Sequence, residues 1–155
     1  LLMKYKTLYC TDLDKTLFAP VGTYEEDGDL AKFISDNTFW NNLWTKKLPC
    51  KDTCNHFYDT GYAYVVIVTS REKKWWLPLL LWLRGVKYHQ LIEREVGNTT
   101  ATEDLKYFQL AMLIDSQSGI FRGCEKIFMD DFKPNRDKAQ LLGFSAYDAD
   151  KFNRW

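Results

Sequence analysis

The chain has 155 residues, enough for one domain with a sizeable buried core. Its 21 Lys and Arg balance 21 Asp and Glu, which excludes an overall basic field that attracts nucleic acid, so any nucleic-acid contact must be local. No apolar run is long enough to span a bilayer, and the N-terminus lacks a signal-peptide layout. We therefore expect a cytoplasmic protein with no membrane contact and no evident protein partner.

Aromatic residues make up 16% of the chain, more than a small core needs. Some of them could be exposed for stacking, although core filling is the commoner use. The four cysteines are too few for a disulfide framework in a chain of this length. Cys50, Cys54 and His56 form a C-x3-C-x-H pattern that could hold zinc, but no second pair of ligands lies close in the sequence.

The first predicted element is a β-strand at 4–11, which ends in Asp12, Asp14 and Thr16. Residues two apart on an extended chain point to the same side, so the two carboxylates would crowd each other. At about 4 Å and an effective dielectric near 20 they would repel by roughly 4 kcal/mol, so a cation or a bound proton must intervene. The alternative is a solvated strand end followed by a turn.

The segment 18–60 is predicted to be a small, partly helical insertion after the first strand. Its beginning is rich in Gly, Pro and acidic residues and indicates a surface loop, and 30–44 has apolar residues at roughly helical spacing. Two interpretations are equally supported: a lid over the site, or a packing helix whose Phe39, Trp40 and Trp44 fill the core.

A helix is expected at 51–60, and the apolar stretch 62–68 predicts a central parallel strand. This strand ends in Thr69, Ser70 and Arg71. The Thr69 hydroxyl could contact a phosphate or only cap the next helix. The later elements are expected at 72–84 (a helix that is apolar nearly all round and is either buried or covered by the lid), 87–92 (strand), 103–116 (helix), 125–129 (strand), 134–142 (helix) and 144–147 (strand).

Alternating strands and helices predict an α/β fold with a parallel sheet flanked by helices. In such sheets ligands bind beyond the carboxyl ends of the strands. Asp130 and Asp131 follow the strand at 125–129 and would therefore join Asp12 and Thr69 at that edge. Clustering of these residue types at one edge indicates an active site.

In order along the chain, these patterns resemble the four motifs of the haloacid dehalogenase (HAD) superfamily of phosphohydrolases. The matching residues are Asp12, Asp14 and Thr16, then Thr69, then Lys106, and finally Asp130 and Asp131. The resemblance implies one Rossmann-like HAD domain over 1–155, with 18–60 as its lid or flap. Lys106 fits the third motif better than Lys87 or Lys126. The chain has Lys15 where many members have glycine.

The resemblance also implies a phosphatase, or phosphoric monoester hydrolase, that works through an aspartyl-phosphate intermediate. Asp12 would be the nucleophile and Asp14 the general acid and base. Thr69 and Lys106 would hold phosphoryl oxygens. The implied cofactor is Mg²⁺, and the residues implied to hold it are Asp12, Asp14 through its backbone carbonyl, and Asp130 or Asp131.

Several stretches look like the 3′-phosphatase domains of bacteriophage polynucleotide kinase-phosphatases, including 61–72 and 128–131. This implies a nucleic-acid 3′ end or a nucleotide as substrate, with Arg71 gripping a phosphate and Thr16 and Ser70 nearby. A surface salt bridge of Arg71 with Glu72 or Glu95 is the alternative.

The loop at 18–29 departs from that family because it is acidic where a basic residue is expected, which favours a short oligonucleotide end or a mononucleotide over duplex. No kinase P-loop pattern occurs in the sequence, so we expect no kinase in the same chain. A phosphatase for a small metabolite or phosphoprotein and a non-catalytic binding module stay open as alternatives.

Overall fold

The computed structural model describes residues 5–19, 39–116 and 118–154. Its strands are β1 (Thr7–Thr11), β2 (Phe18–Ala19), β3 (Lys46–Lys47), β4 (Ala63–Glu72), β5 (Gln90–Arg94), β6 (Glu125–Asp130) and β7 (Ser145–Asp148). Its helices are α2 (Phe39–Leu43), α3 (Pro49–Thr60), α4 (Leu77–Leu83), α5 (Thr102–Ser116), α6 (Ser118–Phe121), α7 (Lys133–Leu141) and α8 (Ala149–Asn153). None of the helices in these ranges is both long and apolar enough to cross a membrane.

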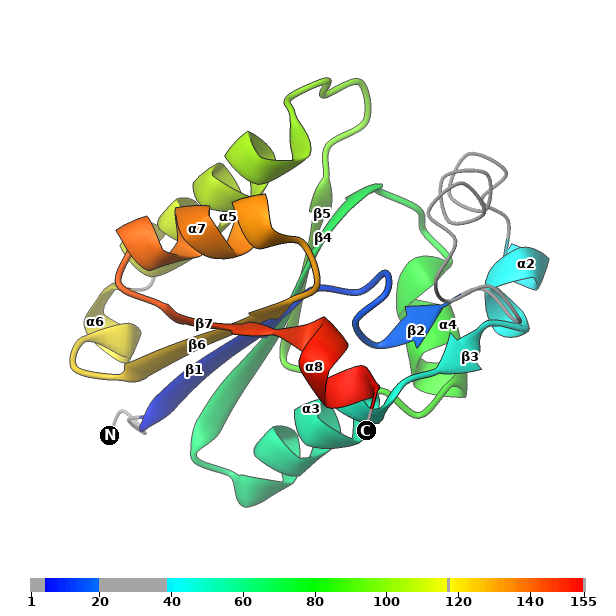
Figure 1. Ribbon diagram of the computed structural model, residues 1–155, viewed down its shortest axis with the longest axis horizontal. Helices are drawn as coiled ribbons and strands as arrows, with labels where there is room; N and C mark the ends of the chain where they lie inside the picture. Colours follow the sequence, from blue (N-terminus) through cyan, green and yellow to red (C-terminus); the bar gives the residue numbers. More distant parts are fainter. Residues whose placement is uncertain (1–4, 20–38, 117, 155) are drawn as a thin grey trace.

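Five parallel strands form the central sheet in the order β5-β4-β1-β6-β7 (Figure 1). The strand β1 lies in the middle, where Cys10 is paired with Val66 of β4 on one side and Phe128 of β6 on the other. The chain first builds the sheet outward from β1 through β4 and β5, and then returns to add β6 and β7. The predicted α/β parallel sheet is confirmed, and the direction of winding reverses at β1, where such sheets open a crevice for ligands.

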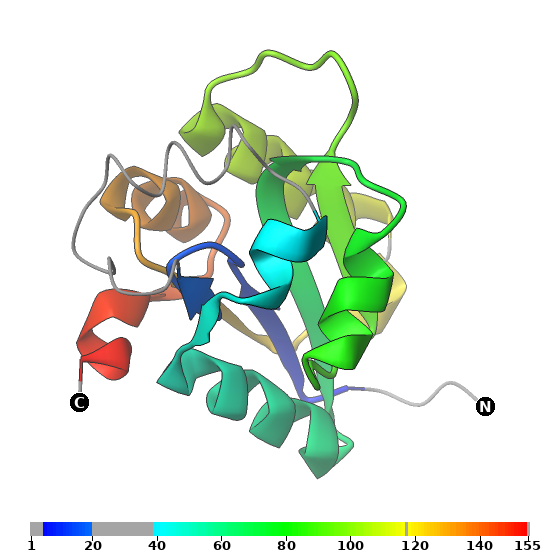
Figure 2. The ribbon, with the colours of Figure 1, turned by 90° about the vertical axis from the view of Figure 1, so that its right-hand side faces the viewer.

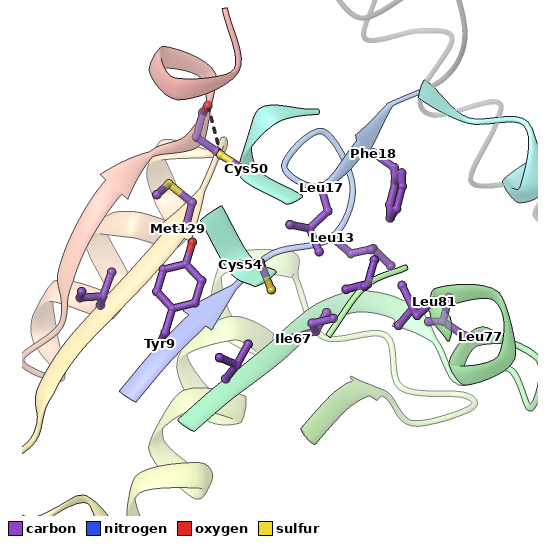
Figure 3. Packing of buried hydrophobic residues seen from close by; sticks show 14 of the residues in the cluster. Tyr9, Leu13, Leu17, Phe18, Cys50, Cys54, Ile67, Leu77, Leu81 and Met129 are labelled. Carbon is purple, nitrogen blue, oxygen red and sulfur yellow. Dashed lines mark hydrogen bonds between the residues drawn. The ribbon is translucent and has the colours of Figure 1, made fainter. Parts of the chain in front are cut away.

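The two faces of the sheet bury alternate residues of the same strands. Tyr9 and Ile67 pack on the face covered by α3, α4 and α8, as Figure 3 shows for this cluster. Cys10 and Val66 pack on the opposite face, under α5, α6 and α7. Burial of each large aliphatic side chain stabilises the fold by about 1.5–3 kcal/mol. The strands β1 and β4 are therefore apolar along their length because both of their faces are covered.

The boundary between β4 and α4 differs from the prediction. We expected a helix from residue 72, whereas β4 continues to Glu72, which pairs with Arg94 of β5 after a register shift beyond Val68. The expectation of burial on all sides is also wrong, because Leu79 and Trp82 on the outer side of α4 are exposed. An apolar sequence cannot show which side of a short helix meets the sheet.

Residues 20–38 of the predicted insertion lie outside the described residues, and the lid stays a prediction. In the described part, β2 and β3 form a short antiparallel pair beside α2. Phe39 is half-buried against the core, whereas Trp40 and Trp44 are exposed and do not fill it. The helix α3 packs on β1 and β4 and is part of the layer that covers the sheet.

The cysteines of the C-x3-C-x-H pattern are core residues. Cys50 and Cys54 are fully buried one helical turn apart in α3. The Cys54 thiol lies 3.5 Å from the carbonyl oxygen of Lys87, and the Cys50 thiol faces the carbonyl of Ala149. Burial raises the pKa of each thiol to about 12, which keeps it protonated. These thiols are explained by packing, and within the described residues no group of possible metal ligands includes them.

Candidate active site

The candidate site lies where β1 and β6 end, beside the later residues of β4. Thr11, the last residue of β1, is in register with Ile67 of β4 and Met129 of β6. The backbone amide of Asp12 donates to the carbonyl oxygen of Met129 at 2.9 Å, which holds Asp12 beside the end of β6. Parallel pairing thus brings Asp12 and Asp130 to the same level of the sheet, although they are far apart in the sequence.

Three carboxylates form a cluster at this edge. Asp12, Asp130 and Asp131 each offer an oxygen, and these oxygens all lie within 4.8 Å of one another. Asp12 and Asp130 are buried. Burial and then the charge of Asp12 raise the pKa of Asp130 to about 7. Burial, Asp12 and Asp130 raise the pKa of Asp131 to about 9. A dense set of oxygen donors of this kind is what Mg²⁺ prefers.

These shifts predict that the metal-free protein loses stability as the pH rises. The folded-state pKa values of Asp130 and Asp131 lie above the ordinary value of 3.8, so the folded protein binds protons that the unfolded chain has released. This stabilisation is complete below pH 4 and is lost as the pH rises through about 7 and then about 9. The slope per carboxyl is at most about 1.4 kcal/mol per pH unit. Urea unfolding between pH 5 and 9 with EDTA measures how the free energy of unfolding depends on pH. Asp131→Asn should make this dependence weaker in the upper part of the range.

Lys106 of α5 is fully buried and reaches into the cluster. Its Nζ lies 2.8 Å from Asp12 Oδ1 and 3.9 Å from Asp130 Oδ2, and it also donates to the carbonyl oxygen of Val68. Burial lowers the pKa of Lys106, but Asp12 and Asp130 more than offset this effect, so the net shift is upward and the ammonium stays charged. By contrast, Lys87 pairs with Asp59 on the surface.

Asp130 is held in place by the start of α7. Its Oδ1 accepts from the backbone amide of Phe132 at 2.8 Å, and its Oδ2 accepts from Asn135 Nδ2 at 3.0 Å. Asn135 is buried, and sequence reasoning missed it. The only signal was an asparagine in the first turn of the helix that follows the acidic pair.

Asp14 does not join the carboxylate cluster; its side chain pairs with Arg71 of β4. Arg71 Nε donates to Asp14 Oδ2 at 2.8 Å and Nη2 donates to Oδ1 at 2.5 Å, a two-pronged ion pair. Arg71 Nη1 also donates to Asn42 Oδ1 at 2.5 Å. Arg71 is 5% exposed, so the alternative of a surface salt bridge with Glu72 or Glu95 is wrong. No motif pointed to Asn42, because its partner lies 29 residues away.

The predicted hydroxyl residues occupy different positions. Thr69 is buried, and its Oγ1 accepts from the amide of Arg71 at 3.1 Å. Thr16 is also buried, and its Oγ1 donates to Asp12 Oδ2 at 3.4 Å. Ser70 lies between two buried residues of β4 and is itself only half-buried, which indicates that its hydroxyl faces the other side of the strand. Gln109, which sequence reasoning also missed, donates from Nε2 to the carbonyl oxygen of Thr69 at 3.1 Å.

The tight loop after β1 requires an unusual backbone conformation at position 15. Lys15 has φ 59°, a left-handed conformation that glycine adopts at no steric cost. Its amide donates to the carbonyl oxygen of Phe18 at 2.8 Å, which closes the turn. Asn153 Nδ2 of α8 donates to the carbonyl oxygen of Thr16 at 3.0 Å and fixes the loop from outside. The turn brings Thr16 back to Asp12.

No family model matches the sequence, and no curated protein matches it either. Solved structures do resemble it. A chain of the Pnkp1/Rnl/Hen1 RNA repair complex is 14% identical, with a TM-score of 0.68, over 93% of this chain and 42% of that chain. The HAD domain of the effector protein Lem4 from Legionella pneumophila is 13% identical, with a TM-score of 0.52, over 94% of this chain and 86% of that domain.

The parallel sheet with an acidic cluster at the end of its central strand defines an α/β domain. More particularly, its fold is that of the HAD domain, as the expected resemblance implied. This chain spans less than half of the RNA repair chain that it matches.

Proposed function

We propose that this protein is a Mg²⁺-dependent phosphomonoester hydrolase that forms an aspartyl-phosphate on Asp12. The observation that supports this most is the environment of Asp12. Its carboxylate is buried at the end of the central strand, 2.8 Å from the Lys106 ammonium and within 4.8 Å of Asp130 and Asp131. A structural role would not require three clustered carboxylates around one buried lysine, because such a cluster costs stability.

Lys106 and the Thr16 hydroxyl hold Asp12 from two sides and fix the direction of its carboxylate. In the first step an oxygen of Asp12 bonds to phosphorus while the bond to the leaving oxygen breaks, and Asp14 gives that oxygen a proton. In the second step water attacks phosphorus and gives its proton to Asp14. The bond between Asp12 and phosphorus then breaks, which frees inorganic phosphate and restores the enzyme.

Asp12, Asp130 and Asp131 are the residues that would hold Mg²⁺, together with the backbone carbonyl of Asp14. Bound there, the ion supplies positive charge that offsets the charge of the phosphoryl group and of the carboxylates.

The pairing of Asp14 with Arg71 has a consequence for the proposed acid. Both oxygens of the Asp14 carboxylate accept from Arg71, whereas the proposed acid must reach the leaving group of the substrate. We infer that a phosphate of a nucleotide substrate other than the one hydrolysed takes over the Arg71 guanidinium, since a phosphate accepts the same fork of donors. Asp14 is then free to take up the proton that it later transfers.

We propose nucleic-acid 3′ ends or nucleotides as substrates. The motif resemblance and the shared fold with a chain of an RNA repair complex support this. The test is phosphate release with Mg²⁺ from a 3′-phosphorylated oligonucleotide, a 5′-phosphorylated oligonucleotide, mononucleotides and an aryl phosphate, each repeated with EDTA. EDTA-sensitive release selective for 3′ ends supports end repair, and a preference for mononucleotides indicates a nucleotidase. Release from the aryl phosphate alone indicates a metabolite or phosphoprotein phosphatase, and no release overturns the proposal.

Arg71→Ala is expected to reduce kcat/KM more for nucleotides than for an aryl phosphate. A charge-assisted, two-pronged contact contributes about 1.5–3 kcal/mol, which corresponds to roughly a 10- to 150-fold loss on the substrate that uses it. Steady-state kinetics on both substrates measure the difference. Arg71→Lys keeps the charge without the fork and should recover little of the loss. An equal loss on both substrates would show that Arg71 does not contact the nucleotide.

A further inference from the structure

Most of the tryptophans are concentrated in two short segments, 39–48 and 71–84. Of the six in the chain, these segments hold Trp40, Trp44, Trp75, Trp76 and Trp82. Trp76 packs edge-on against Phe39, with ring centroids 6.0 Å apart. The other four are exposed by 67%, 71%, 83% and 73% in chain order. We call these four residues, Trp40, Trp44, Trp75 and Trp82, the tryptophan surface, and core packing does not explain them.

The two segments are neighbours in space because α2 and α4 lie side by side, as Figure 2 shows. Arg84 at the end of α4 ties them together. Its Nη1 donates to the carbonyl oxygen of Leu43 at 3.0 Å, and its Nη2 donates to that of Thr45 at 2.7 Å. Its guanidinium also lies 4.6 Å from the centre of the Phe18 ring. The backbone that supports the tryptophan surface is therefore fixed.

The charge of these segments differs from that of the whole chain. They hold six basic residues, Lys46, Lys47, Arg71, Lys73, Lys74 and Arg84, against one acidic residue, Glu72. Elsewhere acidic residues compensate, since the whole chain is neutral. Lys46, Lys47 and Lys73 are exposed. Arg71 is buried and pairs with Asp14, so it adds no charge to the surface, and Glu93 lies beside Lys74. The positive charge near the exposed indole rings therefore comes from the lysines of the two segments.

The two segments also contribute residues to the candidate active site. The second segment begins at Arg71, which pairs with Asp14, and the first segment contributes Asn42 to the same guanidinium. A polymer whose terminal phosphate lies at Asp12 would therefore meet α2 and α4 next. Exposed aromatic rings among lysines are the features that bind single-stranded nucleic acid, because bases stack on the rings and phosphates attract the ammonium groups.

We propose that the tryptophan surface and its lysines bind a single-stranded nucleic acid whose phosphorylated end enters the site. The direction of the strand rests on the proposed function. The basic charge of the two segments matches a phosphodiester chain. Duplex is disfavoured because its bases are already stacked within the helix.

The test measures binding separately from turnover. Asp12→Asn protein is titrated with a fluorescent, 3′-phosphorylated oligothymidylate in EDTA, and anisotropy and tryptophan fluorescence are recorded. Trp75→Ala and Trp82→Ala should each weaken binding by about tenfold, and phenylalanine at either position should recover most of it. If four lysines each contact a phosphate, log K should fall with log salt with a slope of about −3. Leu141→Ala and Lys151→Ala change exposed residues outside the two segments and should have no effect.

The proposal is overturned if the Trp75→Ala and Trp82→Ala proteins bind as tightly as their parent, or if an oligomer of the same length without bases binds equally well. Binding to phosphatidylserine vesicles but not to the oligonucleotide overturns it in favour of a membrane surface. In wild-type background the tryptophan variants should raise KM for the oligonucleotide and leave aryl phosphate hydrolysis unchanged. Tryptophan-dependent binding without turnover of any phosphate ester would support the binding surface and reject the proposed function. Turnover of a phosphate ester without oligonucleotide binding would support the phosphatase and reject the binding surface.

Discussion

Asp12→Asn is expected to abolish phosphate release, with a loss of at least about 10³-fold in kcat on every substrate. An amide is a poor nucleophile, and no other described carboxylate pairs with the Lys106 ammonium at 2.8 Å. The fold should survive, because the asparagine oxygen can still accept from Lys106 and because a negative charge is removed from the crowded acidic cluster. Phosphate release, urea unfolding and circular dichroism of the variant provide the measurement.

The matched control is Asp59→Asn, which alters an exposed aspartate paired with Lys87 far from the cluster and should leave turnover unchanged. A second readout tests the covalent step itself. Acid-quenched wild-type protein should gain the mass of one phosphoryl group during turnover, and the Asp12→Asn protein should not. Activity in Asp12→Asn close to that of the wild type would remove Asp12 from the role of nucleophile.

Lys106→Met is expected to destabilise the protein by about 3–5 kcal/mol at pH 8 and to abolish activity. Methionine fills much of the same volume, so the effect comes mainly from charge. Without the ammonium, Asp12 and Asp130 become buried negative charges with no cation beside them, although Asp130 keeps its bonds from Phe132 and Asn135. Urea unfolding in EDTA measures the change in the free energy of unfolding.

The pH dependence separates charge from packing in this variant. Removal of Lys106 raises the folded-state pKa of Asp130 further above its unfolded value, so the lost stability is greatest at high pH and is regained as Asp130 takes up a proton. The destabilisation should therefore be smaller at pH 5 than at pH 8, and adding Asp130→Asn should relieve part of it. Lys151→Met on the surface should change stability by less than about 0.5 kcal/mol. Equal destabilisation at both pH values would contradict an electrostatic role.

Sequence patterns alone predicted the strands that build the site, since β1 and β4 are buried on both faces and must be continuously apolar. They also placed Asp12 and Asp130 at strand ends, whereas Thr69, expected at the end of its strand, lies within β4, which continues to Glu72. Once the strands are parallel, these ends meet at one edge, so local patterns sufficed to predict which residues gather there. The approach of Lys106 from α5 was predicted only through the family resemblance, because a lysine on a helix looks the same in sequence whether it is exposed or buried.

Only the tertiary structure decided which partner each side chain has. Asp14 and Arg71 are 57 residues apart, and Arg71 and Asn42 are 29 apart, and no spacing rule links residues at such separations. The burial of Asn135 depends on the position of α7 beside Asp130. The sequence also did not show which side of α4 faces outward, because hydrophobicity does not tell which face of a short helix the sheet covers. The sequence determined the strands of the central sheet and the edge at which the candidate site residues lie. Packing determined the contacts of these residues and the exposure of the tryptophans, because both depend on neighbours that are distant along the chain.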